Sequence, residues 1–157
     1  MDRIDTTAFA SPDHMPDRWA GGTSMTAVPI TTAAMARAHV RAVVLEQWSS
    51  PPRRATETAV IDLLLVVSEL AANAVRHGGG LVGVEVTSTR EGVRLAVHDN
   101  SDVVPAAAFG SGDLPSAHHG NGYGWPLIIR LARDIAIERR PGGGKTIRVL
   151  VPLQTMP

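Results

Sequence analysis

One long helical pattern constrains this sequence more than any other stretch. Beside its apolar side, Glu69, Asn73 and His77 recur every fourth residue and form a polar row, with about 6 Å between neighbours. A carboxylate, a carboxamide and an imidazole on the edge of a buried helix are costly to bury unless something polar covers them. The row therefore indicates either a ligand or metal site, or the solvated flank of an ordinary amphipathic helix. The apolar stripe itself, at i, i+4, i+7 and i+11, consists of Leu63, Val67, Leu70 and Ala74.

Three helices are predicted in all. The first runs from an N-cap at Thr31 or Thr32 to about Trp48, where two serines and two prolines end it. The second contains the polar row, starts near Thr56 and ends at His77, before three glycines. The third is expected over residues 122–133.

Strand patterns lie between and after these helices. Residues 81–89 and 93–98 alternate apolar and polar side chains around a short polar turn, which predicts a hairpin. A second hairpin is expected around a Pro-Gly-Gly-Gly turn, with alternating isoleucines and valines on both sides. Residues 26–30 read as one more short strand. This order predicts an α+β fold, a two-layer sandwich in which helices cover one face of a mostly antiparallel sheet.

Length and composition limit the possible classes of protein. The 157 residues fit one domain over residues 26–157, preceded by a flexible tail over residues 1–25 that lacks periodicity. With 15 basic and 15 acidic residues, nothing indicates a nucleic-acid or polybasic membrane contact. The absence of cysteine excludes disulfides and thiolate chemistry. No apolar run reaches the length of a membrane span or a signal core, so we expect a cytoplasmic protein.

Two further motifs follow the central helix. An acidic turn, Asp-Asn-Ser-Asp, begins at Asp99, and Gly120, Gly122 and Gly124 are spaced by single residues at the start of the third helix. Glycines at a helix N-terminus allow backbone amides to approach phosphate oxygens. Taken singly, the first motif is also compatible with an ordinary turn, and the second with a flexible loop.

In this order, the three segments resemble the N, G1 and G2 boxes of the GHKL ATPase and kinase superfamily. The sequences ELAANAVRHG and GGGKTIRVLVP are most similar to the small anti-sigma factor serine/threonine kinases of the actinomycete type, and the resemblance covers residues 26–153. It implies the Bergerat fold of histidine-kinase-like ATPases, with ATP and Mg²⁺ as cofactors. It also implies transcription regulation by partner switching, in which a serine of a STAS-domain antagonist is phosphorylated and a sigma factor is captured. Relatives commonly form homodimers.

The resemblance also assigns roles to individual residues. Asn73 corresponds to the magnesium ligand, and Glu69, one turn earlier, corresponds to the general base. Asp99 corresponds to the carboxylate that accepts the adenine amino hydrogens, and Thr146 to the threonine that supports this contact. Because a carboxylate only accepts hydrogen bonds, such a site selects ATP over GTP.

Cations are scarce in the resembled site. Arg76 and His77 either touch phosphates or act as C-terminal cations that interact with the helix dipole. Residues 95–129 contain no Lys or Arg, whereas the resembled kinases place a basic lid side chain by the terminal phosphate. Two functions therefore stay open: an ATP-dependent protein serine kinase, or a nucleotide-gated protein that switches partners without phosphotransfer.

The segment over residues 102–121 is poor in periodicity and suits a loop or lid that orders on binding. Within it, His118 and His119 belong either to a solvated lid or to a metal site, although adjacent histidines cannot supply a full ligand set. Trp125, directly after the last glycine, either covers the nucleotide, faces a partner or packs in the core.

Overall fold

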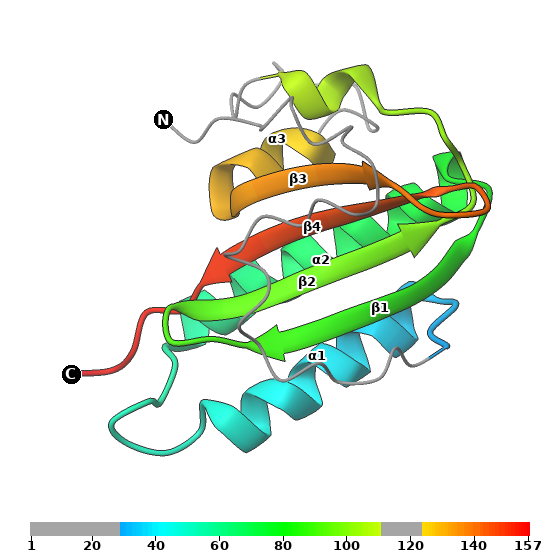
Figure 1. Cartoon of the computed structure of the whole chain (residues 1–157). Helices are drawn as coiled ribbons and strands as arrows, with labels where there is room; N and C mark the ends of the chain where they lie inside the picture. Colours follow the sequence, from blue (N-terminus) through cyan, green and yellow to red (C-terminus); the bar gives the residue numbers. More distant parts are fainter. Residues whose placement is uncertain (1–28, 111–123) are drawn as a thin grey trace.

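The computed structural model describes residues 29–110 and 124–157. In chain order the elements are α1 (Ala33–Gln47), α2 (Glu57–His77), β1 (Leu81–Ser88), β2 (Gly92–Asp99), the 3-10 helix η3 (Ala106–Phe109), α3 (Gly124–Leu131), β3 (Arg133–Arg139) and β4 (Lys145–Pro152) (Figure 1).

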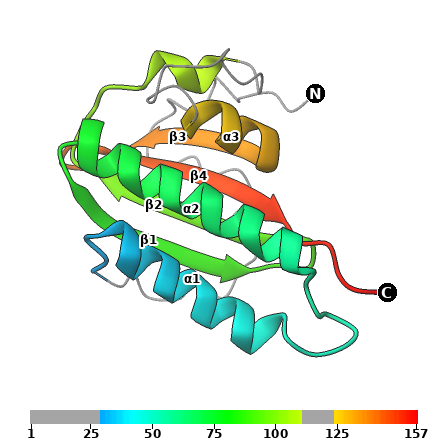
Figure 2. The ribbon, with the colours of Figure 1, turned by 180° about the vertical axis from the view of Figure 1, so that it is seen from behind.

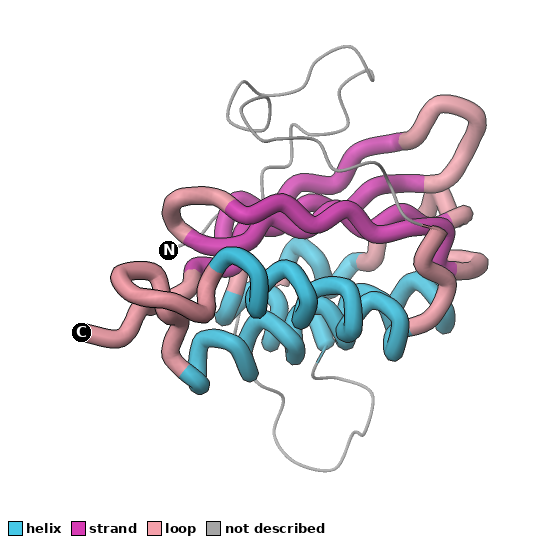
Figure 3. The backbone as a smooth tube through the Cα atoms, turned by 90° about the horizontal axis from the view of Figure 1, so that it is seen from below, coloured by secondary structure: helices cyan, strands magenta, loops and turns pink. Residues whose placement is uncertain are grey.

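The four described strands form one antiparallel sheet. Their order is β1-β2-β4-β3, so β2 and β4 are the central strands and the last strand of the chain pairs with both β2 and β3. All three α-helices cover the same face of this sheet, with α2 running along its middle (Figure 2). Seen along the layers, the helices form one layer and the strands form the other (Figure 3). The predicted α+β two-layer sandwich is confirmed.

Local chemistry places the ends of the first two helices where the sequence predicted them. The hydroxyl of Thr32 accepts a hydrogen bond from the backbone N–H of Met35, and Thr56 caps α2 in the same way through Ala59, both at 3.1 Å. The α2 helix ends at His77, and the N–H of the next residue, Gly78, donates back to carbonyls of its last turn. The cap at Thr56 therefore fixes the start of the helix that contains the polar row, and Gly78 its end.

The core is built around α2. All four residues of the predicted apolar stripe are buried, with Ala74 the most exposed at 3%. By length and mean hydropathy, α2 is the one described helix long and apolar enough to cross a membrane. In the fold, however, its apolar side packs on β2 and on the neighbouring helices, which is the ordinary environment of a core helix.

Two predictions about element boundaries are wrong. Pro29 and Ile30 are not part of a strand, and the rest of the expected strand over 26–30 lies outside the described residues. Proline lacks the N–H that a strand ladder needs, and Ile30 contributes to the core from an extended segment instead. The third helix ends at Leu131 rather than at 133, because Arg133 already pairs with Leu150 as the first residue of β3.

Candidate functional site

The polar row of α2 meets the first residue of α3. A Cβ atom placed on Gly124 would lie 2.9 Å from Glu69 Oε2 and 3.6 Å from both terminal atoms of Asn73. Only glycine permits this close approach without displacing the carboxylate. The N-terminus of a helix carries partial positive charge, and the start of α3 brings this charge to these side chains.

The side-chain amide of Asn73 is the least satisfied polar group of this region. Its Nδ2 atom is buried and has no hydrogen-bond partner within residues 29–110 and 124–157. A buried donor without a partner costs about 1–3 kcal/mol. Because the two ends of a carboxamide can exchange places by rotation, Asn73 can offer a partner either its N–H or its oxygen.

These side chains fit a magnesium ion that is bound together with phosphate. Mg²⁺ takes oxygen ligands, keeps several waters and uses only one or two protein side chains beside substrate phosphates. Asn73 and Glu69 supply oxygens of this kind. The described residues contain no group of three or more acidic or histidine side chains that could hold a metal ion by themselves. The site therefore suits a metal whose remaining ligands are water and phosphate.

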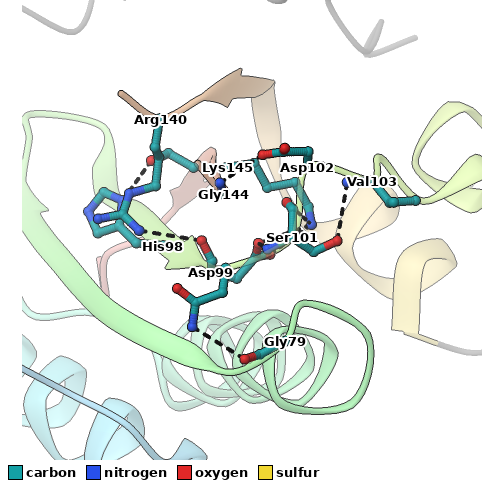
Figure 4. Close-up of polar contacts among 11 residues, drawn as sticks. Gly79, His98, Asp99, Ser101, Asp102, Val103, Arg140, Gly144 and Lys145 are labelled. Carbon is teal, nitrogen blue, oxygen red and sulfur yellow. Dashed lines mark hydrogen bonds and ion pairs between the residues drawn. The ribbon is translucent and has the colours of Figure 1, made fainter. Parts of the chain in front are cut away.

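Asp99 lies at the end of β2 and is almost completely buried, at 2% exposed. Its carboxylate is held by the Lys145 ammonium, with Nζ 2.9 Å from Oδ2 and 3.1 Å from Oδ1 (Figure 4). The backbone N–H of Ser101 donates to Oδ1 at 2.9 Å, and Lys145 Nζ also donates to the Ser101 carbonyl at 3.2 Å. The acidic turn of the sequence is thus an ordered ion-pair site.

Strand pairing explains why these two charges meet. Asp99 and Lys145 are direct partners across the β2–β4 ladder, and both continue the alternation of inward-facing residues on their strands. The end of α2 closes over them, because a Cβ on Gly78 would lie 2.7 Å from the Asp99 carboxylate. The backbone N–H of Asn100 donates to the Gly78 carbonyl at 2.8 Å and fixes this contact.

The turn between β3 and β4 is attached to the same place. The N–H of Gly144 donates to Asp102 Oδ1 at 2.7 Å, and Arg140 Nη1 lies 3.4 Å from the backbone carbonyl of Asp99 (Figure 4). Three segments distant in sequence therefore converge at this edge of the sheet: the end of α2, the end of β2, and the β3–β4 turn with the start of β4.

The expectation for Thr146 does not fit its position. Thr146 follows Lys145 on β4, so its side chain points to the opposite face of the sheet from Asp99. There its Oγ1 lies 2.6 Å from His98 Nδ1, whereas the contact with Asp99 belongs to Lys145. Sequence reasoning missed Lys145, although its place in the alternation of β4 with Ile147 already indicated an inward-facing side chain.

His98 also contacts Glu85, with Nε2 3.5 Å from Oε2. Burial of the imidazole lowers the pKa of His98 below its ordinary value of 6.5; Glu85 opposes this shift, while Arg140 and Arg148 add to it. These groups lie on the face of the sheet that the helices do not cover.

The other predicted site residues have varied positions. Arg76 and His77 are exposed in the last turn of α2, where cations complement the helix dipole. Trp125 is 6% exposed and belongs to the hydrophobic core, so of its three interpretations core packing is confirmed. Gly120 and Gly122, with His118 and His119, lie outside the described residues.

Comparison with known proteins supplies a family for this arrangement. The histidine kinase-like ATPase domain family matches residues 30–150, which covers most of the chain and includes both α2 and the Asp99–Lys145 pair. Domains of this family bind ATP, typically together with Mg²⁺.

Individual relatives are longer proteins. The chain is 34% identical over 102 residues to the sensor-type histidine kinase PrrB of Mycobacterium tuberculosis and of Mycobacterium bovis, with 57% of this chain and 23% of the relative covered. The PrrB protein of Mycobacterium leprae is 36% identical over 94 residues, with 52% and 21% covered. The chain thus spans less than a quarter of the length of the curated relatives it matches. On the family match, which covers well over half of its length, the chain belongs to the histidine kinase-like ATPase domains of the GHKL superfamily.

Proposed function

We propose that this domain binds Mg·ATP with its phosphates between α2 and the start of α3, and that it transfers the terminal phosphate to a protein serine. One observation carries the proposal. Gly124 approaches Glu69 so closely that a Cβ atom would meet its carboxylate, and the amide nitrogen of Asn73 is buried without a partner in the described part of the chain. A phosphate oxygen would accept a hydrogen bond from this N–H, and the carboxamide oxygen of the same side chain would be left for the magnesium ion.

In this proposal each side chain has one task. Asn73 holds the metal through its carboxamide oxygen, and the metal, when bound, neutralises the charge of the phosphates. Glu69 accepts the proton of the serine hydroxyl. The serine oxygen then forms a bond to the terminal phosphorus, while the bond between that phosphorus and the bridging oxygen breaks and leaves ADP. The start of α3 supplies backbone N–H groups that orient the phosphate oxygens.

The choice of phosphate acceptor rests on the resemblance of ELAANAVRHG and GGGKTIRVLVP to anti-sigma factor kinases. On this basis the partner is a STAS-domain antagonist whose serine is phosphorylated, together with a sigma factor that the domain captures in the cytoplasm. The curated relatives are named histidine kinases, so a histidine on a partner is the competing acceptor.

One observation favours a second candidate function, a nucleotide-gated protein that binds partners without phosphotransfer. Lys145 is the buried cation of the site, and its ammonium is bound to Asp99 and Ser101 rather than to the side chains of the polar row. A transferring enzyme needs positive charge beside the terminal phosphate, whereas a binding protein does not.

The metal role is tested by calorimetry with and without Mg²⁺. Asn73→Ala should weaken ATP binding at least about tenfold in the presence of magnesium and change it little in its absence. A variant that keeps the magnesium dependence of the unmutated protein would remove Asn73 as the ligand.

Transfer is tested with labelled ATP, magnesium and candidate STAS proteins. Glu69→Gln keeps the size and hydrogen bonding of the side chain but cannot accept the proton, so transfer should fall by roughly 10²–10⁴-fold while ATP binding persists. Tight nucleotide-dependent partner binding without any transfer by the unmutated protein would support the gated binding protein instead. Label recovered on histidine would identify the competing acceptor.

A further inference from the structure

We infer that Lys145 is a specificity-determining residue of this site, which occupies the base-reading carboxylate of Asp99 and makes the choice between purines weak. The inference rests on the proposed function, because it takes Asp99 to be the group that meets the nucleobase. It concerns one property of that site, the ratio of affinities for ATP and GTP.

The hydrogen-bonding capacity of the pair is nearly exhausted within the protein. An ammonium has three donors, and those of Lys145 have three acceptors: both oxygens of Asp99 and the carbonyl of Ser101 (Figure 4). An ionised carboxylate offers about four acceptor positions. Oδ1 uses two of them, for Lys145 and for the Ser101 N–H, and Oδ2 uses one for Lys145. The position that remains, on Oδ2, lies beside Gly78.

The strength of these bonds decides which partner the carboxylate keeps. Lys145 and Asp99 attract each other as opposite full charges, whereas a neutral amino group would offer the carboxylate a hydrogen bond without that attraction. Both side chains are only 3% exposed, so water does not weaken their attraction. The neutral amino group of adenine therefore cannot displace Lys145, and it gains at most the one position left on Oδ2.

The pair also changes which bases are tolerated. A lone carboxylate presents only acceptors, which reject the 6-oxo group of guanine or hypoxanthine. Beside Lys145, the Asp99 carboxylate keeps only one acceptor position and the ammonium offsets its negative charge, so the pair attracts a 6-amino group less, and repels a 6-oxo group less, than a lone carboxylate does. Selection at this end is then small, and the affinity for a nucleotide comes mainly from its phosphates and metal.

The experiment compares the affinities of Mg·ATP, Mg·GTP and Mg·ITP by calorimetry. We expect the unmutated protein to prefer ATP over GTP by less than about tenfold, and Lys145→Met to prefer ATP by at least about 100-fold, because it frees Asp99 for the amino group. Arg148→Met is the matched control, since it removes a cation of the same strand on the opposite face. It should leave the ratio unchanged.

A second variant and a second measurement keep the test decisive if Lys145→Met folds poorly. Lys145→Gln retains a neutral donor and should shift the ratio in the same direction by a smaller factor. The rise in melting temperature with each nucleotide reports the same ratio for a weakly stable variant.

Three results are distinguishable. Strong preference of the unmutated protein for ATP, by about 100-fold or more, overturns the role of Lys145 and leaves nucleotide binding intact. A ratio that stays the same in both Lys145 variants also overturns it. If no magnesium nucleotide binds the unmutated protein, the proposed function itself fails, and the inference fails with it.

Discussion

The phosphate end and the base end of the proposed nucleotide site treat their polar groups in opposite ways. In the last turns of α2, Asn73 has a buried amide nitrogen for which the described residues offer no partner, and Glu69 faces the start of α3. At the end of β2, Asp99 is also buried, but its carboxylate is bound by Lys145 and by a backbone N–H. One end is incomplete without a ligand, and the other is complete within the protein.

This difference separates binding from stability. A buried group without a partner lowers the stability of the free protein and gains free energy when a ligand satisfies it. A buried group that is already paired gains little free energy from a ligand, and removing either partner of the pair lowers the stability of the protein. The resemblance implies a metal contact at one end and a nucleobase contact at the other. The two ends need not contribute equally to nucleotide affinity.

The largest expected effect is on folding. Asp99→Ala leaves the Lys145 ammonium buried without its counter-ion and should lower the free energy of unfolding by about 3–5 kcal/mol. Asn73→Ala removes an amide whose nitrogen lacks a partner in the described structure, and alanine is the better helix former, so its change should stay within about 1 kcal/mol. Urea unfolding of both variants without ligand measures the contrast. Equal losses of stability in the two variants would contradict the distinction between the two ends.

A smaller effect is expected on catalysis. In Gly124→Ala the new methyl group would lie 2.9 Å from Glu69 Oε2, and the flexible carboxylate can move away at little cost in stability. Because a displacement of about 1 Å of a reacting group can cost about 10²-fold in rate, phosphotransfer should fall by about that factor. In the Glu69→Gln background the same substitution should add almost nothing. A further full loss in that background would show that Gly124 acts by another route than Glu69.

The smallest expected effect is on the pH dependence of stability, and it distinguishes the two faces of the sheet. The lowered pKa of His98 means that the folded protein binds fewer protons than the unfolded chain just below the ordinary value of 6.5. Its contribution to stability is therefore complete above 6.5 and is lost as the pH falls through the lowered pKa. His98→Gln should flatten the decline in urea midpoint between about pH 7.5 and about pH 5.5.

The exposed His77 provides the control, because His77→Gln should keep that decline. Since His98 lies on the face opposite Asp99, His98→Gln should also leave nucleotide affinity unchanged. An altered affinity would mean that the Thr146–His98 contact acts on the base end through the sheet.

Much of this contrast could be predicted from the sequence, because many of its features depend only on residues close together in the chain. The caps at Thr32 and Thr56, and the polar row of α2, depend on residues three or four apart, so the pattern contains them directly. The predicted hairpins were equally local. The boundary of the third helix was not, because the pairing of Arg133 with Leu150 ends it.

The base end could be predicted only in part, because its decisive contact joins residues 46 positions apart. Asp99 stood out as a charge at the end of an apolar strand, whereas Lys145 directly follows a glycine-rich turn. Extending the alternation of Ile147 one step back would have turned Lys145 inward and Thr146 outward. The pairing of the two charges also needed the register of β2 on β4, which no single strand pattern contains.

The late place of β4 in the chain has a consequence for synthesis on the ribosome. Asp99, Glu69 and Asn73 are all translated well before Lys145, yet β4 is the strand inserted between β2 and β3. Until β4 has emerged and paired, the nascent chain has the Asp99 carboxylate without its counter-ion, and β2 without its second neighbour. An interruption of translation within the last strand removes the centre of the sheet and the cation of the site in one event.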